Sequence, residues 1–254
     1  ASHINLHFYN FGKHDYTERE LEAIRGVYDA SLYDLDRATG FLLGRLKDRG
    51  DLDNTIVVLT SDHGENLGDH HLFNHRFTLA DSLAHVPLIV SGPGIERGEI
   101  ETPVSTMDIF PTLCAWSHVP VPKHLSGHLT KAPRPAVTRM ELPLRREIET
   151  VQAIHPDVQV EPWIKSGHAM VDADLQKLVR WDGGDALSYD LHADPGEEQP
   201  GTPSQHQVKA LQDWTRQVPP YDPEWRTEAD DPVHVRASQE ELKAHLEALG
   251  YIQE

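Results

Sequence analysis

Two short apolar runs rich in β-branched residues constrain the fold of this chain more than any other feature. Residues 55–60 are Thr-Ile-Val-Val-Leu-Thr, and a second apolar run covers residues 86–90. Such continuous runs are typical of strands that are buried on both faces of a parallel sheet. A polar loop and a short helical pattern lie between them. This order predicts a βαβ arrangement with a right-handed crossover and a mostly parallel sheet.

Helical patterns flank the two apolar runs. Thr17 and Glu20 have the spacing of a capping box, and apolar residues recur at helical spacing from there to about Gly50. Another helix is predicted at residues 106–117. The sequence therefore predicts an α/β domain, with helices covering a sheet, over residues 1–130.

The second half of the chain has a different organisation. It begins with a Pro- and His-rich connection and continues with alternating segments separated by turn residues, followed by two amphipathic helical patterns. The predicted strands lie at 136–140, 168–171, 177–181 and 186–191, and the helices at 208–218 and 238–250. Strands followed by helices predict a small antiparallel α+β subdomain within residues 131–254.

Net charge and the distribution of apolar residues argue against two kinds of partner. The chain has 41 Asp and Glu residues against 23 Lys and Arg, a formal net charge of −18. This charge repels a phosphate backbone, so we expect no nucleic-acid partner. No apolar run approaches the ~18 residues that span a bilayer, so we expect no membrane partner. The expected location is cytoplasmic. The acidic composition is typical of a protein that works at high salt, as in a halophile. The alternative is an ordinary acidic cytosolic protein.

Cysteine content excludes an internal disulfide. Cys114 is the only cysteine, and it lies in an apolar stretch of the predicted helix at 106–117. A reactive thiol would need a basic, exposed environment, which this stretch lacks. Cys114 is therefore predicted to be a buried core residue.

The loop after the first apolar run carries the candidate chemistry. Asp62 and His63 follow the run directly, so they should emerge at the carboxyl end of a strand, where ligand sites of open α/β sheets lie. The loop also contains Glu65, Asp69, His70, His71 and His75. Carboxylate and imidazole groups suit a divalent cation such as Ca²⁺, Mn²⁺ or Zn²⁺. A capped turn is the alternative interpretation, but so many acids and histidines in one loop favour a metal site.

Several stretches together form a pattern that extends over nearly all 254 residues. They are Thr60-Ser-Asp-His-Gly-Glu-Asn-Leu-Gly-Asp-His70, Asn74-His-Arg76, His85-Val-Pro-Leu-Ile-Val-Ser-Gly-Pro-Gly94, Ser105-Thr-Met-Asp-Ile-Phe-Pro-Thr-Leu113, Leu187-Ser-Tyr-Asp-Leu-His-Ala-Asp-Pro-Gly-Glu197 and Leu246-Glu-Ala-Leu-Gly-Tyr251. In content and order they resemble the C-terminal half of the sulfatase family in the alkaline phosphatase superfamily. The resemblance implies an alkaline-phosphatase-like α/β fold and metal-dependent hydrolysis of a small-molecule or glycan sulfate ester.

The resemblance also implies roles for individual residues. Asp62 and His63 match the late pair of metal ligands, for which Ca²⁺ is the expected ion. His75, or else Arg76, falls where the family places a cationic residue against the sulfate oxygens. The alternative for His75 is a solvated loop histidine. His70 and His71 are expected to lie behind the ligands or at the surface.

One part of the family pattern does not occur in these 254 residues. Sulfatases generate their nucleophile from Cys or Ser in a Cys/Ser-x-Pro-x-Arg stretch, preceded by two adjacent acidic ligands. Cys114 is followed by Ala-Trp-Ser-His and does not fit. We therefore expect the chain to be the C-terminal part of a longer enzyme and to be inactive by itself. Two alternatives remain: a phosphonate monoester or phosphodiester hydrolase of the same superfamily, and a noncatalytic metal-binding domain.

If neighbouring strands come from outside this chain, the predicted strands at 55–60 and 86–90 should expose apolar surface. Both runs have the composition of strands covered on two faces. We therefore expect an unpaired edge and an uncovered face at these strands.

Overall fold

The computed structural model describes residues 3–122, 125, 127–130, 135–140, 145–184 and 186–217. The chain divides into two compact units, Ala1–Val208 and Lys209–Glu254. In the second unit the structure describes only the last turns of one helix, so the predicted helix at 238–250 lies outside the described residues. The predicted domain boundary after residue 130 stays a prediction.

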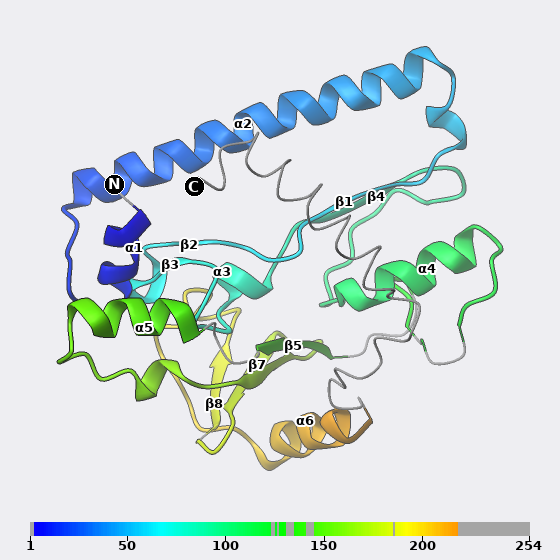
Figure 1. Cartoon of the computed structure of the whole chain (residues 1–254). Coiled ribbons are helices and arrows are strands. Elements are labelled where there is room, and N and C mark those ends of the chain that lie inside the picture. The colour runs from blue at the N-terminus through cyan, green and yellow to red at the C-terminus, as the bar shows by residue number, and fades with distance from the viewer. Residues whose placement is uncertain are drawn as a thin grey trace, which may run out of the picture. The chain divides into compact units, whose positions relative to one another are not determined.

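The described part of the chain contains both helices and strands (Figure 1). The helices are α1 (His3–Asn10), α2 (Glu18–Asp48), α3 (Asp81–Ala84), α4 (Ile109–Trp116), α5 (Arg145–Ile154) and α6 (Gln205–Gln217). The strands are β1 (Val57–Thr60), β2 (Asn66–Leu67), β3 (Phe73–Asn74), β4 (Leu88–Ser91), β5 (Ala136–Met140), β6 (Gly167–Val171), β7 (Gln176–Trp181) and β8 (Ala186–Asp190). Short 3₁₀ turns are at Leu52–Asn54, Asp69–His71, Thr106–Asp108 and Glu161–Trp163. None of the described helices is both long and apolar enough to cross a membrane.

Strands β1 and β4 pair antiparallel, so the predicted parallel βαβ arrangement is wrong for this pair. Val57 lies opposite Ser91, and Thr60 lies opposite Leu88. A parallel pair needs a crossover that returns the chain to the other end of the sheet, usually a helix. Here the connection holds the β2–β3 hairpin and the single turn α3, and it enters β4 beside the end of β1. The apolar runs indicated burial, and burial does not specify strand direction.

Helix α2 forms as the capping box predicts. The Thr17 amide donates to Oε2 of Glu20 at 2.8 Å, and the Glu20 amide donates to Oγ1 of Thr17 at 3.4 Å. None of the residues of α2 is buried, and Val27 and Phe41 are 68% and 72% exposed. The helix therefore presents an apolar stripe that the described residues leave uncovered.

The β1–β4 pair is also partly uncovered by the described residues. It forms a two-stranded sheet in which Leu59 and Ile89 are exposed, Ile89 by 62%. The expectation of exposed apolar surface at these strands is therefore confirmed. Burial on both faces, which the composition of the runs indicated, is not reached among the residues that the structure describes.

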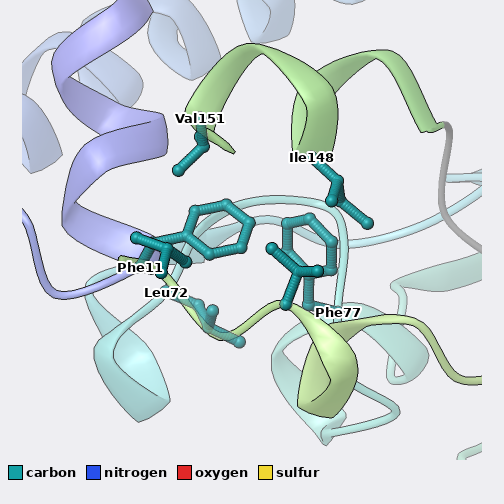
Figure 2. Close-up of a cluster of buried hydrophobic side chains, with 7 residues drawn as sticks. Phe11, Leu72, Phe77, Ile148 and Val151 are labelled. Atoms are coloured by element: carbon teal, nitrogen blue, oxygen red, sulfur yellow. The ribbon is translucent and has the colours of Figure 1, made fainter. Parts of the chain in front are cut away.

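Two apolar clusters fix the segment between β3 and α3. In the first, Phe11, Leu72 and Phe77 pack against Ile148 and Val151 of α5 (Figure 2). In the second, Leu79 packs with Ala169 of β6 and Val179 of β7. Because residues 72, 77 and 79 are all anchored in this way, the intervening His75 and Arg76 have a defined position.

The remaining strands form one antiparallel sheet in the order β5-β6-β7-β8. Strand β5 has the limits that the sequence predicted, and β6, β7 and β8 lie within two residues of the predicted ones. Gly183, in the turn between β7 and β8, has a φ of +72°, which a residue without a side chain adopts readily. Cys114 is buried in α4, as predicted.

Candidate metal centre

The four residues singled out from the sequence line one cavity. Asp62 and His63 follow the end of β1 by two and three positions, and His75 and Arg76 follow β3. The cavity measures about 580 Å³, and its other walls include residues 105–107 and 137–140. Its size is within the range of small-molecule sites, ~300–1,000 Å³. Segments far apart in the sequence therefore meet at the place where the apolar run predicted a ligand site.

The two carboxylate oxygens of Asp62 have different neighbours. Oδ1 accepts a hydrogen bond from the His63 amide at 3.0 Å, and Oδ2 lies 3.7 Å from Nε2 of the His63 ring. The amide hydrogen bond, and after it the charge of the His63 ring, hold the pKa of Asp62 below its ordinary value. The carboxylate therefore stays ionised, as a metal ligand must, while its Oδ2 faces an imidazole.

The hydrogen bond of the His63 ring fixes which nitrogen can act as a ligand. Nδ1 lies 2.8 Å from the carbonyl oxygen of Gly64. A carbonyl oxygen only accepts hydrogen bonds, so Nδ1 carries the proton, and in the neutral ring Nε2 keeps its lone pair. Nε2 is the atom that lies near Oδ2 of Asp62.

His75 lies directly against His63. The two rings stack with their centroids 4.2 Å apart and their planes 22° from parallel. Nδ1 of His75 is 3.2 Å from Oε2 of Glu65, a residue to which the sequence analysis gave no individual role. Ligand atoms of His63, Glu65 and His75 all lie within 4.8 Å of one another.

Close packing on α3 holds the loop in place. The Gly64 amide donates to the carbonyl oxygen of Leu83 at 2.9 Å, and a Cβ at position 64 would lie only 2.0 Å from the Ser82 carbonyl oxygen. The buried Asn66 donates to the Asn74 carbonyl at 2.7 Å and accepts from Oγ of Ser82 at 2.7 Å. The absence of a side chain at Gly64 therefore allows the loop that carries Asp62 and His63, here called the ligand loop, to contact the backbone of α3.

The other loop histidines lie away from the cavity. The His71 ring stacks on Tyr9 with a centroid distance of 3.9 Å. Asp69 accepts a hydrogen bond from the Leu67 amide at 3.0 Å. Neither these residues nor His70 is among the residues that line the cavity. His70 and His71 are exposed, which is one of the two positions expected for them, behind the ligands or at the surface.

A buried ion-pair network beneath α3 was missed by the sequence analysis. Nζ of the fully buried Lys177 lies 2.6 Å from Oδ1 of Asp81 and 2.8 Å from Oε1 of Glu197. Oε2 of Glu197 accepts from the amide of Asp81, the first residue of α3. The available signals were a lysine inside an apolar strand and the Asp-Pro-Gly-Glu197 stretch. The network fixes the helix on which the ligand loop rests.

The helices and strands around this cavity belong to a mixed α/β fold, and comparison with known proteins gives the family it resembles. Residues 3–119 match the Sulfatase family model. The chain is 31% identical to arylsulfatase K of Xenopus laevis over 196 residues, and 30% identical to arylsulfatase K of Homo sapiens over 199 residues. Each of these alignments covers 72% of this chain and 34% of the relative, so the chain spans about a third of the length of the curated relatives it matches.

Solved structures agree with this assignment. The phosphonate monoester hydrolase of Agrobacterium radiobacter superposes with a TM-score of 0.58 at 27% identity, covering 80% of this chain and 42% of that chain. A 2-O GAG sulfatase superposes with a TM-score of 0.52 at 22% identity, covering 76% of this chain and 40% of that chain, and supports the fold alone. The resemblance to the sulfatase family and the alkaline-phosphatase-like α/β fold class are therefore confirmed.

Proposed function

We propose that this chain contributes the late metal ligands and the sulfate-binding cations of a metal-dependent sulfuric ester hydrolase. The observation that carries the proposal is the meeting of Asp62, His63, His75 and Arg76 in one cavity of a sulfatase-like fold. The named relatives are arylsulfatases, which supports a sulfate ester as the substrate class. The ester would be a small molecule or a glycan.

Asp62 and His63 fit a shared divalent cation. Oδ2 of Asp62 and Nε2 of His63 are 3.7 Å apart on the same cavity wall, and neither atom is the one engaged by the loop backbone. The carboxylate suits Ca²⁺, our first choice, and the imidazole also suits Mn²⁺ or Zn²⁺. When bound, such a cation polarises a sulfate oxygen and favours the ionised form of a nucleophile.

The chain's own residues would orient the sulfate group. Glu65 accepts from Nδ1 of His75 and so fixes the orientation of that ring at the cavity wall. A positive charge on His75 or Arg76 would stabilise the negative charge that develops on the transferring group. The nucleophile is assigned to polypeptide other than residues 1–254, because no Cys/Ser-x-Pro-x-Arg stretch occurs in them.

We expect the native gene product that contains these residues to hydrolyse 4-nitrophenyl sulfate with added Ca²⁺ or Mn²⁺, and residues 1–254 alone to show no metal-dependent turnover. Asp62→Asn in the native product should lower kcat/KM by about 10²-fold or more, because it removes the ligand charge. Asp69→Asn is the matched control, since Asp69 lies in the same loop, accepts the Leu67 amide and is not among the residues that line the cavity. Turnover by residues 1–254, or equal losses in the two variants, would refute the assignment.

A phosphonate monoester hydrolase is the second candidate. It is favoured by the Agrobacterium radiobacter structure, which has both 27% identity and a TM-score of 0.58. The same native product should be assayed on 4-nitrophenyl sulfate and on 4-nitrophenyl phenylphosphonate. A higher kcat/KM for the phosphonate ester would select this candidate over the sulfatase.

Substitutions at position 75 distinguish a charge role of His75 from a structural one. His75→Gln should lower kcat by about 10²–10³-fold, the cost of losing one donor to the developing charge. His75→Lys restores a cation and should stay within about tenfold of the native protein. His192→Gln, at an exposed position after β8, serves as the control. If the lysine variant is as inactive as the glutamine variant, the charge role of His75 is wrong.

A further inference from the structure

The β2–β3 hairpin brings Glu65 and His75 together through its register. Asn66 pairs with Asn74, so the preceding Glu65 and the following His75 lie across from each other at the end of the hairpin. The Asn66 side chain also bonds to the Asn74 carbonyl at 2.7 Å, which ties the two strands together at this pair. The 3.2 Å contact of Glu65 with His75 is therefore built into the backbone arrangement.

His63 completes a group of three ligand-type side chains. Its ring stacks on His75 at 4.2 Å, and one ligand atom from each of His63, Glu65 and His75 lies within 4.8 Å of the other two. The Gly64 amide, between His63 and Glu65, is bonded to the Leu83 carbonyl on α3. The three side chains therefore come from a supported loop and from a hairpin end.

We propose that His63, Glu65 and His75 form a Zn²⁺ site that does not include Asp62. Two imidazoles and one carboxylate are a donor set that zinc takes in sites with an open fourth position. Ca²⁺ prefers six to eight oxygen ligands, so a set with two nitrogens disfavours it. Asp62 stands apart, because its Oδ1 holds the His63 amide and its side chain is 85% exposed.

The inference deepens the proposed function, because His63 belongs to both ligand sets. The cation held by Asp62 and His63 would need the imidazole that the Zn²⁺ site also uses. Zn²⁺ bound to the three residues would also replace the Glu65–His75 hydrogen bond and remove His75 from the sulfate. The Zn²⁺ site is thus an inhibitory alternative to the catalytic arrangement, although it can be tested without turnover.

The test measures Zn²⁺ affinity of purified residues 1–254 by calorimetry at high salt, where we expect the chain to be most stable, with Co²⁺ absorption as a probe of the ligand set. Glu65→Gln and His75→Gln should each weaken Zn²⁺ binding by at least about tenfold and change the Co²⁺ spectrum. Asp62→Asn and the exposed control His192→Gln should stay within about twofold. A hundredfold excess of Ca²⁺ should leave Zn²⁺ bound. Circular dichroism melts of each variant separate ligand loss from misfolding.

Each other result overturns the inference. If Asp62→Asn weakens Zn²⁺ as much as Glu65→Gln does, the ion uses the Asp62–His63 pair. If no variant changes the affinity, or if no Zn²⁺ binds, the three residues do not form the site. Failure of the proposed function is distinguishable, because it appears in turnover of the native product.

Discussion

Replacing Lys177 with methionine is expected to lower the free energy of unfolding by about 3–5 kcal/mol, the cost of removing one partner of a buried ion pair. The ammonium group is fully buried and lies 2.6 Å from the Asp81 carboxylate and 2.8 Å from that of Glu197. Methionine fills most of the space but leaves two carboxylates beside each other without a cation. The loss should be measured by urea denaturation.

The control is an exposed ion pair with the same distance between its charged atoms. Lys13 lies 2.6 Å from Asp157, but that aspartate side chain is 70% exposed. Lys13→Met should therefore cost at most about 1 kcal/mol, as exposed ion pairs generally do. Adding Asp81→Asn and Glu197→Gln to Lys177→Met should recover part of the stability, because it removes the uncompensated charges. Equal losses for the two lysines would show that burial does not set the strength of this network.

The Lys177 network matters for the site because of where it ends. Asp81 begins α3, and Leu83 in the same turn accepts the amide of Gly64 in the ligand loop. A helix of one turn has little stability of its own, so tertiary contacts must hold it. We infer that the loop with Asp62 and His63 owes part of its position to the strand that carries Lys177.

Local patterns of the sequence predicted most elements but not how they pair. The limits of β5 and the start of α2 after Thr17 followed from alternation and from the capping box, which act over a few residues. The antiparallel pairing of β1 with β4 did not follow, because an apolar run carries no information on direction. The direction of pairing depends on the path of the connection between the two strands. The sequence of that connection, residues 61–87, has no strong periodicity from which its path could be predicted.

The same distinction holds for the candidate site. Asp62 and His63 could be selected because they follow a strand directly and match a family pattern. The contact of Glu65 with His75 depends on a hairpin whose two strands have only two paired residues each, which is too short to predict from a sequence pattern. The Lys177–Asp81 bond joins residues 96 positions apart, and only the folded chain brings them together.

The apolar surface of α2 that the described residues leave uncovered is expected to favour association. Apolar side chains along the helix are more than half exposed: Val27, Leu32, Leu35, Phe41 and Leu42. Exposed apolar patches of this kind promote interaction with other polypeptides or aggregation. The two-stranded β1–β4 sheet also exposes apolar side chains, those of Leu59 and Ile89. Its unpaired edges should further favour association.

Net charge should make the stability of residues 1–254 depend on salt. The formal charge of −18 repels itself in dilute buffer, and salt reduces the Debye length from ~10 Å at 0.1 M to ~3 Å at 1 M. We expect the chain to be unstable or aggregation-prone at low salt, and its Tm to rise by roughly 4–8 °C between these concentrations, equivalent to about 2 kcal/mol.

Thermal melts across a KCl series, with light scattering to follow aggregation, measure this dependence. The control is the same series near the isoelectric point, where the net charge vanishes and the effect of screening on Tm should largely disappear. A salt effect that persists there would come from the apolar surface, because salts can also strengthen apolar burial. A high, cooperative Tm that is independent of salt would contradict both the adaptation to high salt and the need for further polypeptide to cover α2 and the β1–β4 pair.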